Sequence, residues 1–136
     1  LRQFYPATNK HLQQEVAEKG LLLSQFWPDA SPRREHFPIR NATMSGLGIA
    51  TFIAEAGETS GARIQARKAV EHGRPVILSN IVVERNHWAQ QLIGKPRVWE
   101  ANSADEALSI VRRLAAARDE LETLLGDAAR MLSASA

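Results

Sequence analysis

Three short groups of residues combine side chains and backbone features that could bind a charged ligand. Arg40 and Asn41 follow the sequence Phe37-Pro38-Ile39, and together they read F-P-I-R-N. Residues 57–61 read Gly-Glu-Thr-Ser-Gly and precede a predicted helix, whose free amides and positive end favour an anion. Glu55 stands near the end of an apolar run, where its carboxylate could accept a hydrogen bond from a ligand hydroxyl or orient Arg40.

Each of these groups also has a purely structural interpretation. An ordinary helix N-cap would give the same turn ending in Ser60 and Gly61. Arg40 could bond the carbonyl groups of the preceding loop, which contains three prolines. The residue types indicate a binding site only if the fold brings the groups to one place.

Basic residues are unevenly distributed. The formal net charge is only +2, but residues 1–100 hold 13 Lys and Arg against 9 Asp and Glu, whereas residues 101–136 hold 4 against 6. This pattern fits a phosphate-binding surface, although a solvated helix face has the same composition. The basic residues between positions 33 and 74 are Arg33, Arg34, Arg40, Arg63, Arg67, Lys68 and Arg74.

The elements that must position these residues alternate between short apolar runs and helical patterns. This alternation predicts an α/β fold, a partial Rossmann-like (doubly wound) and mostly parallel sheet with flanking helices. Residues 49–56 give the strongest strand signal and are expected to form a central strand covered on both faces. The other expected strands are 21–23, 75–78 and 98–100, and the expected helices are 9–19, 39–47, 83–93 and one capped by Thr59 or Ser60 that ends at His72.

A long C-terminal helix is expected from a capping box at Ser103–Glu106 to about Leu125. We divide the chain accordingly into residues 1–102, the half-domain, and residues 103–136, the helix. The first part of its apolar stripe should pack on the sheet, whereas the second has no obvious partner and predicts self-association. The first part is Leu108, Val111 and Leu114, and the second is Leu121, Leu124, Leu125 and Ala128.

The composition excludes several kinds of site. The chain has no cysteine, so it has neither disulfides nor a thiolate metal site. Its four histidines are dispersed without metal-ligand spacing, and no apolar run approaches the roughly 20 residues of a membrane-spanning helix. We therefore expect a cytoplasmic protein with no bound metal and no membrane partner. Because the chain begins with Leu1, we expect it to be a piece of a longer protein.

The order and spacing of short motifs resemble the second half of the Rossmann-like domain of the DprA (Smf) family. The similarity extends from about residue 4 to residue 78, and its strength lies in the combination of motifs. The matching pieces are Tyr5-Pro6, Gly20-Leu21-Leu22-Leu23-Ser24, Phe37-Pro38-Ile39-Arg40-Asn41, Gly46-Leu47, Glu55-Ala56, Ser60-Gly61, Ala69 and Gly73-Arg74-Pro75-Val76.

This resemblance implies a recombination mediator that binds and protects single-stranded DNA, assists a RecA-type recombinase, and acts in DNA uptake and transformation. It also implies a homodimer without a cofactor or catalytic residues. The implied DNA pocket is bordered by Arg40, Asn41, Ser60 and Gly61, with Arg33, Arg34 and Arg63 as further phosphate contacts and Phe37 and Glu55 as supporting residues.

The sequence also departs from the family pattern. Ala42 replaces a basic residue, Gly48 a serine and Gln65 a threonine, and Ser79-Asn80 stands where Pro-Gly is usual. These departures leave open a nucleotide-sensing domain as an alternative. A relative of the LOG-type phosphoribohydrolases is disfavoured, because Gln65 stands where those enzymes carry an acid, and a glutamine cannot transfer a proton at neutral pH.

Overall fold

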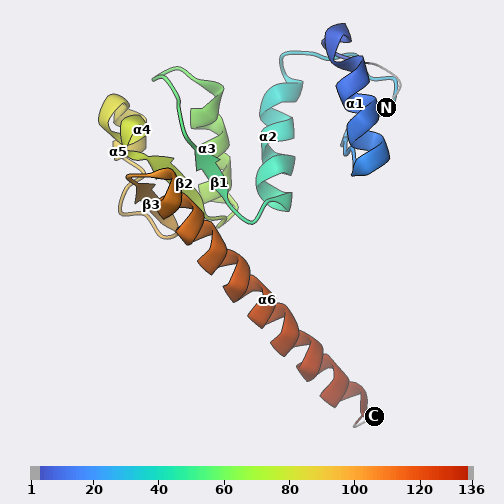
Figure 1. Ribbon diagram of the computed structural model, residues 1–136, viewed down its shortest axis with the longest axis vertical. Coiled ribbons are helices and arrows are strands. Elements are labelled where there is room, and N and C mark those ends of the chain that lie inside the picture. The colour runs from blue at the N-terminus through green and yellow to red at the C-terminus, as the bar shows by residue number, and fades with distance from the viewer. Residues whose placement is uncertain (1–3, 135–136) are drawn as a thin grey trace.

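The computed structural model describes residues 4–134 and contains a three-stranded parallel sheet (Figure 1). Its strands are β1 (Thr51–Ile53), β2 (Val76–Ser79) and β3 (Val98–Ala101), in the spatial order β1-β2-β3. Both pairings are parallel, with Thr51 opposite Val76 and Val76 opposite Val98. The predicted α/β class with a parallel sheet and flanking helices is confirmed.

Helices flank the sheet on both faces. One face is covered by α3 (Gly61–Glu71) together with the short helices α4 (Asn80–Arg85) and α5 (His87–Gln90). The other face carries the start of α6 (Ala104–Ala134), which then leaves the sheet (Figure 1). Helix α2 (His36–Leu47) packs beside α3, and the remaining helices are η1 (Ala7–Asn9) and α1 (Lys10–Lys19).

The hydrophobic core is centred on β2. Val76 and Leu78 face α3 and α4, whereas Ile77 faces α6, and all three side chains are fully buried. The strand predicted over residues 49–56 is shorter than expected, and within residues 4–134 it lies at the edge of the sheet. Only Thr51–Ile53 is a strand, it pairs on one side alone, and Phe52 is 47% exposed.

The ends of α3 follow the sequence signals. The Ser60 hydroxyl accepts a hydrogen bond from the backbone N–H of Ala62 at 3.2 Å, as an N-cap does. His72 ends the helix and Gly73 follows with φ of 64°, a left-handed conformation that costs glycine little. These local contacts fix the point where the 57–61 turn enters the helix.

Two predictions near the N-terminal side are corrected. Residues 21–23 are not a strand, and Leu21 and Leu23 are exposed instead of packing in a sheet. Helix α2 begins at His36, three residues before the expected start, and takes Pro38 into its first turn. A proline is tolerated there because its missing N–H would have had no partner within the helix.

The single helix expected over residues 83–93 is replaced by α4 and α5, with Asn86 between them. Asn86 has extended backbone angles, φ −134° and ψ 119°, which break the helix. Its buried side-chain amide donates to the carbonyl oxygens of Val82 at 2.9 Å and Ala56 at 3.0 Å. Asn86 thus ties α4 to the loop that follows β1.

Helix α6 reaches Ala134, nine residues beyond the expected end at Leu125. Ser103 caps it, with its hydroxyl accepting from the Glu106 N–H at 3.1 Å. The Glu106 carboxylate accepts from the Asn102 backbone N–H at 2.8 Å instead of closing the predicted capping box, and these bonds to Asn102 lower the Glu106 pKa. Ala107 and Ile110 are buried on the sheet, with Val111 and Leu114 beside them, whereas Leu108 is 45% exposed.

No helix within residues 4–134 is both long and apolar enough to cross a membrane. In the same residues, no group of three or more histidine and acidic side chains is arranged to hold a metal ion.

Candidate nucleic-acid interface

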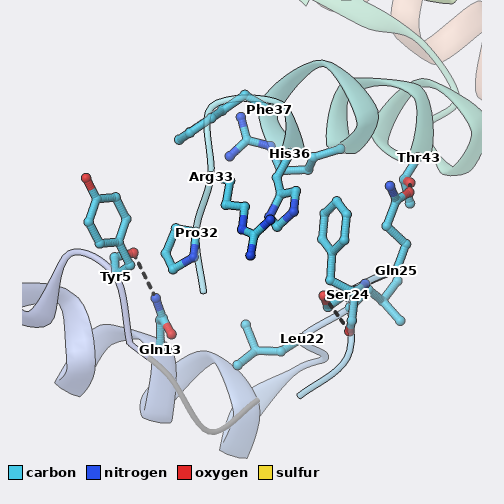
Figure 2. A pocket seen from close by; sticks show the side chains of 13 residues that line it. Tyr5, Gln13, Leu22, Ser24, Gln25, Pro32, Arg33, His36, Phe37 and Thr43 are labelled. Atoms are coloured by element: carbon cyan, nitrogen blue, oxygen red, sulfur yellow. Dashed lines mark hydrogen bonds between the residues drawn. The ribbon is translucent and has the colours of Figure 1, made fainter. Parts of the chain in front are cut away.

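A pocket of about 470 Å³ lies on the side of α2 that faces away from α3. Figure 2 shows its walls: Tyr5 and Gln13 on one side, Pro32 and Arg33 from the long loop, and His36 and Phe37 from the start of α2. The full lining is Tyr5, Gln13, Leu22, Leu23, Ser24, Gln25, Phe26, Pro32, Arg33, His36, Phe37, Arg40 and Thr43.

Helical periodicity explains why four α2 residues share this pocket. His36, Phe37, Arg40 and Thr43 are spaced so that they fall on one side of the helix. The Arg40 guanidinium carbon lies 5.2 Å from the centroid of the Phe37 ring, within the range of a cation–π contact. The Arg40 guanidinium is therefore held over an aromatic face, and its N–H donors stay available because no carboxylate is paired with it in the described chain.

The opposite wall is held in place by local contacts. The His36 and Phe26 rings stack with their centroids 4.1 Å apart and an interplanar angle of 21°. The Ser24 hydroxyl accepts from the Phe26 N–H at 3.1 Å, and the Thr43 hydroxyl donates to the Gln25 side-chain oxygen. These contacts fix residues 24–26 against α2, so the loop has a defined path along the pocket.

Arg33 supplies a second guanidinium to the same pocket, into which its side chain extends in Figure 2. It forms an ion pair with Glu35, whose carboxylate lies 3.9 Å from the guanidinium, and both side chains are largely exposed. Such a surface pair contributes little to stability, and the Arg33 charge can turn to a ligand at small cost. The pocket thus combines two guanidinium groups with the rings of Phe26, His36 and Phe37.

Arg40 and its neighbour Asn41 point to different sides of α2. Asn41 and Ser45 are buried on the side that packs against α3, and the Ser45 hydroxyl lies 2.7 Å from His72 Nδ1. Successive helical residues are turned by about 100°, so a contiguous Arg-Asn pair does not share one surface. Asn41 therefore lies between the two helices and does not line the pocket.

Ser60 and Gly61 stand at the start of α3, at the carboxyl edge of the sheet. Gly61 is exposed, and a Cβ built on it would meet no atom within 4 Å, so the space above the turn is open. The loop before it is tied down: the Ser79 hydroxyl donates to Ala54 O at 2.7 Å, and the Glu58 carboxylate accepts from the His87 N–H at 3.0 Å. The turn at residues 57–61 does not line the pocket. The structure therefore presents two separate places that an anion could reach, the pocket beside α2 and this turn.

The two places nevertheless share one end of the molecule. Helices α2 and α3 each precede a parallel strand and run antiparallel to it, and their N-termini lie at the same end in Figure 1. The N-terminal turns of α2 carry Arg40, and the turn before α3 carries Ser60 and Gly61. An extended ligand crossing the tip of α2 would meet both.

The remaining predicted site residues lie elsewhere. Arg34 and Glu55 are exposed and do not line the pocket, and Glu55 makes no hydrogen bond or ion pair with Arg40. Arg63 is half-buried in the first turn of α3. The structure brings Arg33, Phe37 and Arg40 together and leaves Arg34, Asn41, Glu55, Ser60, Gly61 and Arg63 outside the pocket.

The basic residues between positions 33 and 74 therefore do not form one surface: some line the pocket and others bond elsewhere in the protein. Arg74 donates to the carbonyl oxygen of Gly46 at 2.6 Å, at the C-terminal end of α2. Lys68 pairs with Glu71 at 2.6 Å, and its hydrogen bond and charge lower the Glu71 pKa. Arg74 and Lys68 therefore bond within the protein and do not line the pocket. The pocket residues Phe26 and His36 were not predicted from the sequence. For His36 the available signal was its place four residues before Arg40 on a helix, whereas Phe26 carried no such signal.

Comparison with known proteins identifies relatives over most of the chain. The model of the family described as DNA recombination-mediator protein A matches residues 1–115. DNA processing protein DprA of Streptococcus pneumoniae is 41% identical over 73 residues, 54% of this chain and 26% of that protein. Protein Smf of Escherichia coli is 34% identical over 94 residues, 65% of this chain and 25% of that protein. The chain thus spans about a quarter of the length of these relatives.

Solved structures agree with this relationship. The X-ray structure of DprA from S. pneumoniae superposes with a TM-score of 0.64 at 30% identity, covering 79% of this chain and 38% of that one. DprA from Helicobacter pylori superposes with a TM-score of 0.66 at 24% identity, covering 83% of this chain and 51% of that one, and supports the fold. With its fold and most of its length accounted for, this chain belongs to the DNA recombination-mediator protein A family.

Proposed function

We propose that this chain forms part of the single-stranded DNA-binding surface of a cytoplasmic recombination mediator. The observation that carries the proposal is the pocket in which Arg33 and Arg40 stand among the Phe26, His36 and Phe37 rings. Proteins that bind single strands combine cationic groups for the phosphates with aromatic rings for the bases. The solved structure of DprA from H. pylori describes how that protein binds single-stranded DNA. This supports single-stranded DNA as the ligand of the present chain.

The geometry suggests how a strand would lie. Phosphates would bind the Arg33 and Arg40 guanidinium groups, while a base would enter the pocket beside the Phe37 ring. The strand would continue over the tip of α2 to the open turn at Ser60 and Gly61, where the Gly61 backbone N–H could donate to a phosphate. On this proposal the intact protein works as a homodimer, protects the strand and passes it to a RecA-type recombinase during DNA uptake.

Arg40→Ala in the intact protein tests the DNA site. Loss of one charge-assisted contact, worth about 1.5–3 kcal/mol, should weaken binding roughly tenfold or more, by a similar factor for every sequence. The slope of log affinity against log salt should fall by about one. Fluorescence anisotropy with oligonucleotides of different sequence measures both quantities.

Arg112→Ala is the matched control, because Arg112 is an exposed arginine on α6, on the other side of the sheet. It should leave the affinity close to that of the unmodified protein. Equal affinities for the Arg40 variant, the Arg112 variant and the unmodified protein at low salt would show that the pocket is not the DNA site.

We propose further that the protein does not hydrolyse nucleotides. Gln65 lies in the second turn of α3, where the related hydrolases need an acid, and its side-chain oxygen is buried without a hydrogen-bond partner. An amide in that place can neither donate a catalytic proton nor act as a base. Incubation with a panel of nucleoside monophosphates, followed by chromatography for free base, should give no more product than buffer alone. If base is released above that background, and if mutation of a pocket residue abolishes the release, the protein is an enzyme.

A further inference from the structure

The most exposed large apolar side chain within residues 4–134 is that of Trp27, in the loop that joins α1 to α2. Trp27 is 86% exposed, whereas Trp88 is 4% exposed in the core and Trp99 is half-buried on β3. Tryptophan side chains are highly buried on average. Exposure alone indicates no role, because single apolar side chains are common on protein surfaces. The surroundings of Trp27 supply the argument.

Hydrogen bonds fix the backbone on both sides of Trp27. On the N-terminal side, the Ser24 hydroxyl accepts from the Phe26 N–H at 3.1 Å and donates to the Phe26 carbonyl oxygen at 3.2 Å. On the C-terminal side, the Ala30 N–H donates to the Trp27 carbonyl oxygen at 2.9 Å and closes a turn whose second residue is Pro28. The indole therefore projects from an ordered backbone, so a ligand that contacts it pays little to order the loop.

Trp27 stands beside the pocket that was described above. Its chain neighbour Phe26 lines that pocket, and Cα atoms of bonded residues are about 3.8 Å apart. Trp27 itself does not line the pocket, and the chain returns to the pocket at Pro32 and Arg33 (Figure 2). Both ends of the loop formed by residues 27–31 therefore join the pocket wall, and the indole lies just outside it.

The charges next to this loop favour a nucleic acid as the ligand of the indole. Arg33 lines the pocket, and Arg34 is exposed and forms no ion pair within residues 4–134. An apolar protein segment that covered Trp27 would leave these guanidinium groups without a counter-charge, whereas a nucleic acid brings a phosphate with every base. Aromatic rings beside cationic groups are the arrangement with which proteins bind single strands, because every base has a face that can stack.

We propose that Trp27 stacks on a base of the single strand, next to the base that enters the pocket beside Phe37. The indole then gives the site a second base contact, on the loop side of the pocket, and this contact is independent of sequence. The proposal rests on the single-stranded DNA binding of the proposed function and adds to it a residue that holds a base and no phosphate.

Oligonucleotides with one abasic nucleotide locate the contact, because they lack a single base and keep its phosphate. The shortest strand that binds the intact protein with full affinity is used, so that its register is fixed, and each position is made abasic in turn. With the unmodified protein, loss of the base on Trp27 should weaken binding roughly five- to hundredfold. With the Trp27→Ala protein, the same abasic position should cost nothing further. Abasic losses that are equal in the two proteins at every position would overturn the proposal.

Variants of Trp27 measure the same contact with unmodified strands. Trp27→Ala should weaken binding roughly five- to hundredfold, whereas Trp27→Phe keeps an aromatic face and should retain most of the affinity. Neither variant should change the slope of log affinity against log salt, because no phosphate contact is lost. Leu21→Ala is the matched control, because Leu21 is 72% exposed and does not line the pocket. If Trp27→Ala binds as tightly as Leu21→Ala, the indole does not contact DNA.

Two comparisons separate this proposal from its alternatives. If Arg40→Ala weakens binding and Trp27→Ala does not, the pocket binds DNA and the Trp27 contact alone is refuted. If neither variant weakens binding, the proposed DNA site fails as well. Urea unfolding of Trp27→Ala in the intact protein should give an unchanged midpoint, since the side chain is exposed. A clearly lower midpoint would mean that another part of the intact protein covers the indole, and the proposal would be wrong.

Discussion

Ile77→Ala is expected to destabilise the protein by about 2–5 kcal/mol. Ile77 lies in the middle of β2, the strand with neighbours on both sides, and its side chain is fully buried under α6. The substitution removes apolar contacts and leaves a cavity that the rigid sheet cannot close. Urea unfolding followed by tryptophan fluorescence measures the loss as a shift of the midpoint at constant slope.

Phe52→Ala provides the comparison, because Phe52 pairs directly with Ile77 in the sheet and projects from the same face. Phe52 loses more atoms than Ile77 does, yet it is 47% exposed on the edge strand. We expect a cost of only about 1 kcal/mol, since the side chain gives up roughly half of the burial of a core phenylalanine. A larger loss for Phe52→Ala than for Ile77→Ala would mean that β1 is covered in the intact protein and that its exposed face belongs to an interface.

Asn86→Ala is expected to cost about 2–4 kcal/mol, because it removes the donor to one buried and one partly buried carbonyl oxygen. The Asn86 side chain is 1% exposed and holds Ala56 on the β1–α3 loop and Val82 on α4 together. Its loss should also speed amide hydrogen exchange in residues 57–61, the turn that leads into α3. Urea titration and exchange measured by mass spectrometry report the two effects separately.

Two further variants test this role of Asn86. Asn86→Asp keeps the shape but, when ionised, offers only acceptors to two carbonyl groups, so it should be at least as destabilising as alanine at neutral pH. Burial raises the pKa of such a carboxyl, and part of the stability should return as the pH falls through that raised pKa. Gln90→Ala removes an exposed amide bonded to Val83 O and should change the stability by less than about 0.5 kcal/mol. If the Asn86→Ala protein is as stable as the Gln90→Ala protein, the Asn86 hydrogen bonds to Ala56 O and Val82 O do not stabilise the fold.

Features governed by near neighbours in the chain were predicted well from the sequence. Ser60 and Gly73 bound α3 as expected, because a cap bonds residues two or three positions away and a left-handed glycine needs no distant contact. Strand β2 was also predicted closely, since its apolar run is short and bounded by Pro75 and Ser79. The motifs that resemble the family identified it correctly.

Features governed by distant contacts were not predicted. The apolar run 49–56 has the composition of a central strand, but which strands flank it depends on the whole sheet, and β1 pairs only with β2. The break at Asn86 depends on the Ala56 carbonyl, thirty residues earlier. The separation of Arg40 from Asn41 follows from helical rotation within the expected helix 39–47 itself, whereas the side of α2 that packs on α3 depends on contacts with distant residues. How the site groups combine is thus a property of the packing of α2 on α3.

The projection of α6 beyond the sheet has a thermodynamic consequence. The buried Trp88 reports on the sheet and its covering helices, whereas much of the helical circular dichroism comes from residues 116–134, which touch none of that core. The two parts share a continuous backbone but few contacts, so one can melt without the other. Unfolding is then not a single two-state transition, and no single melting temperature describes the molecule.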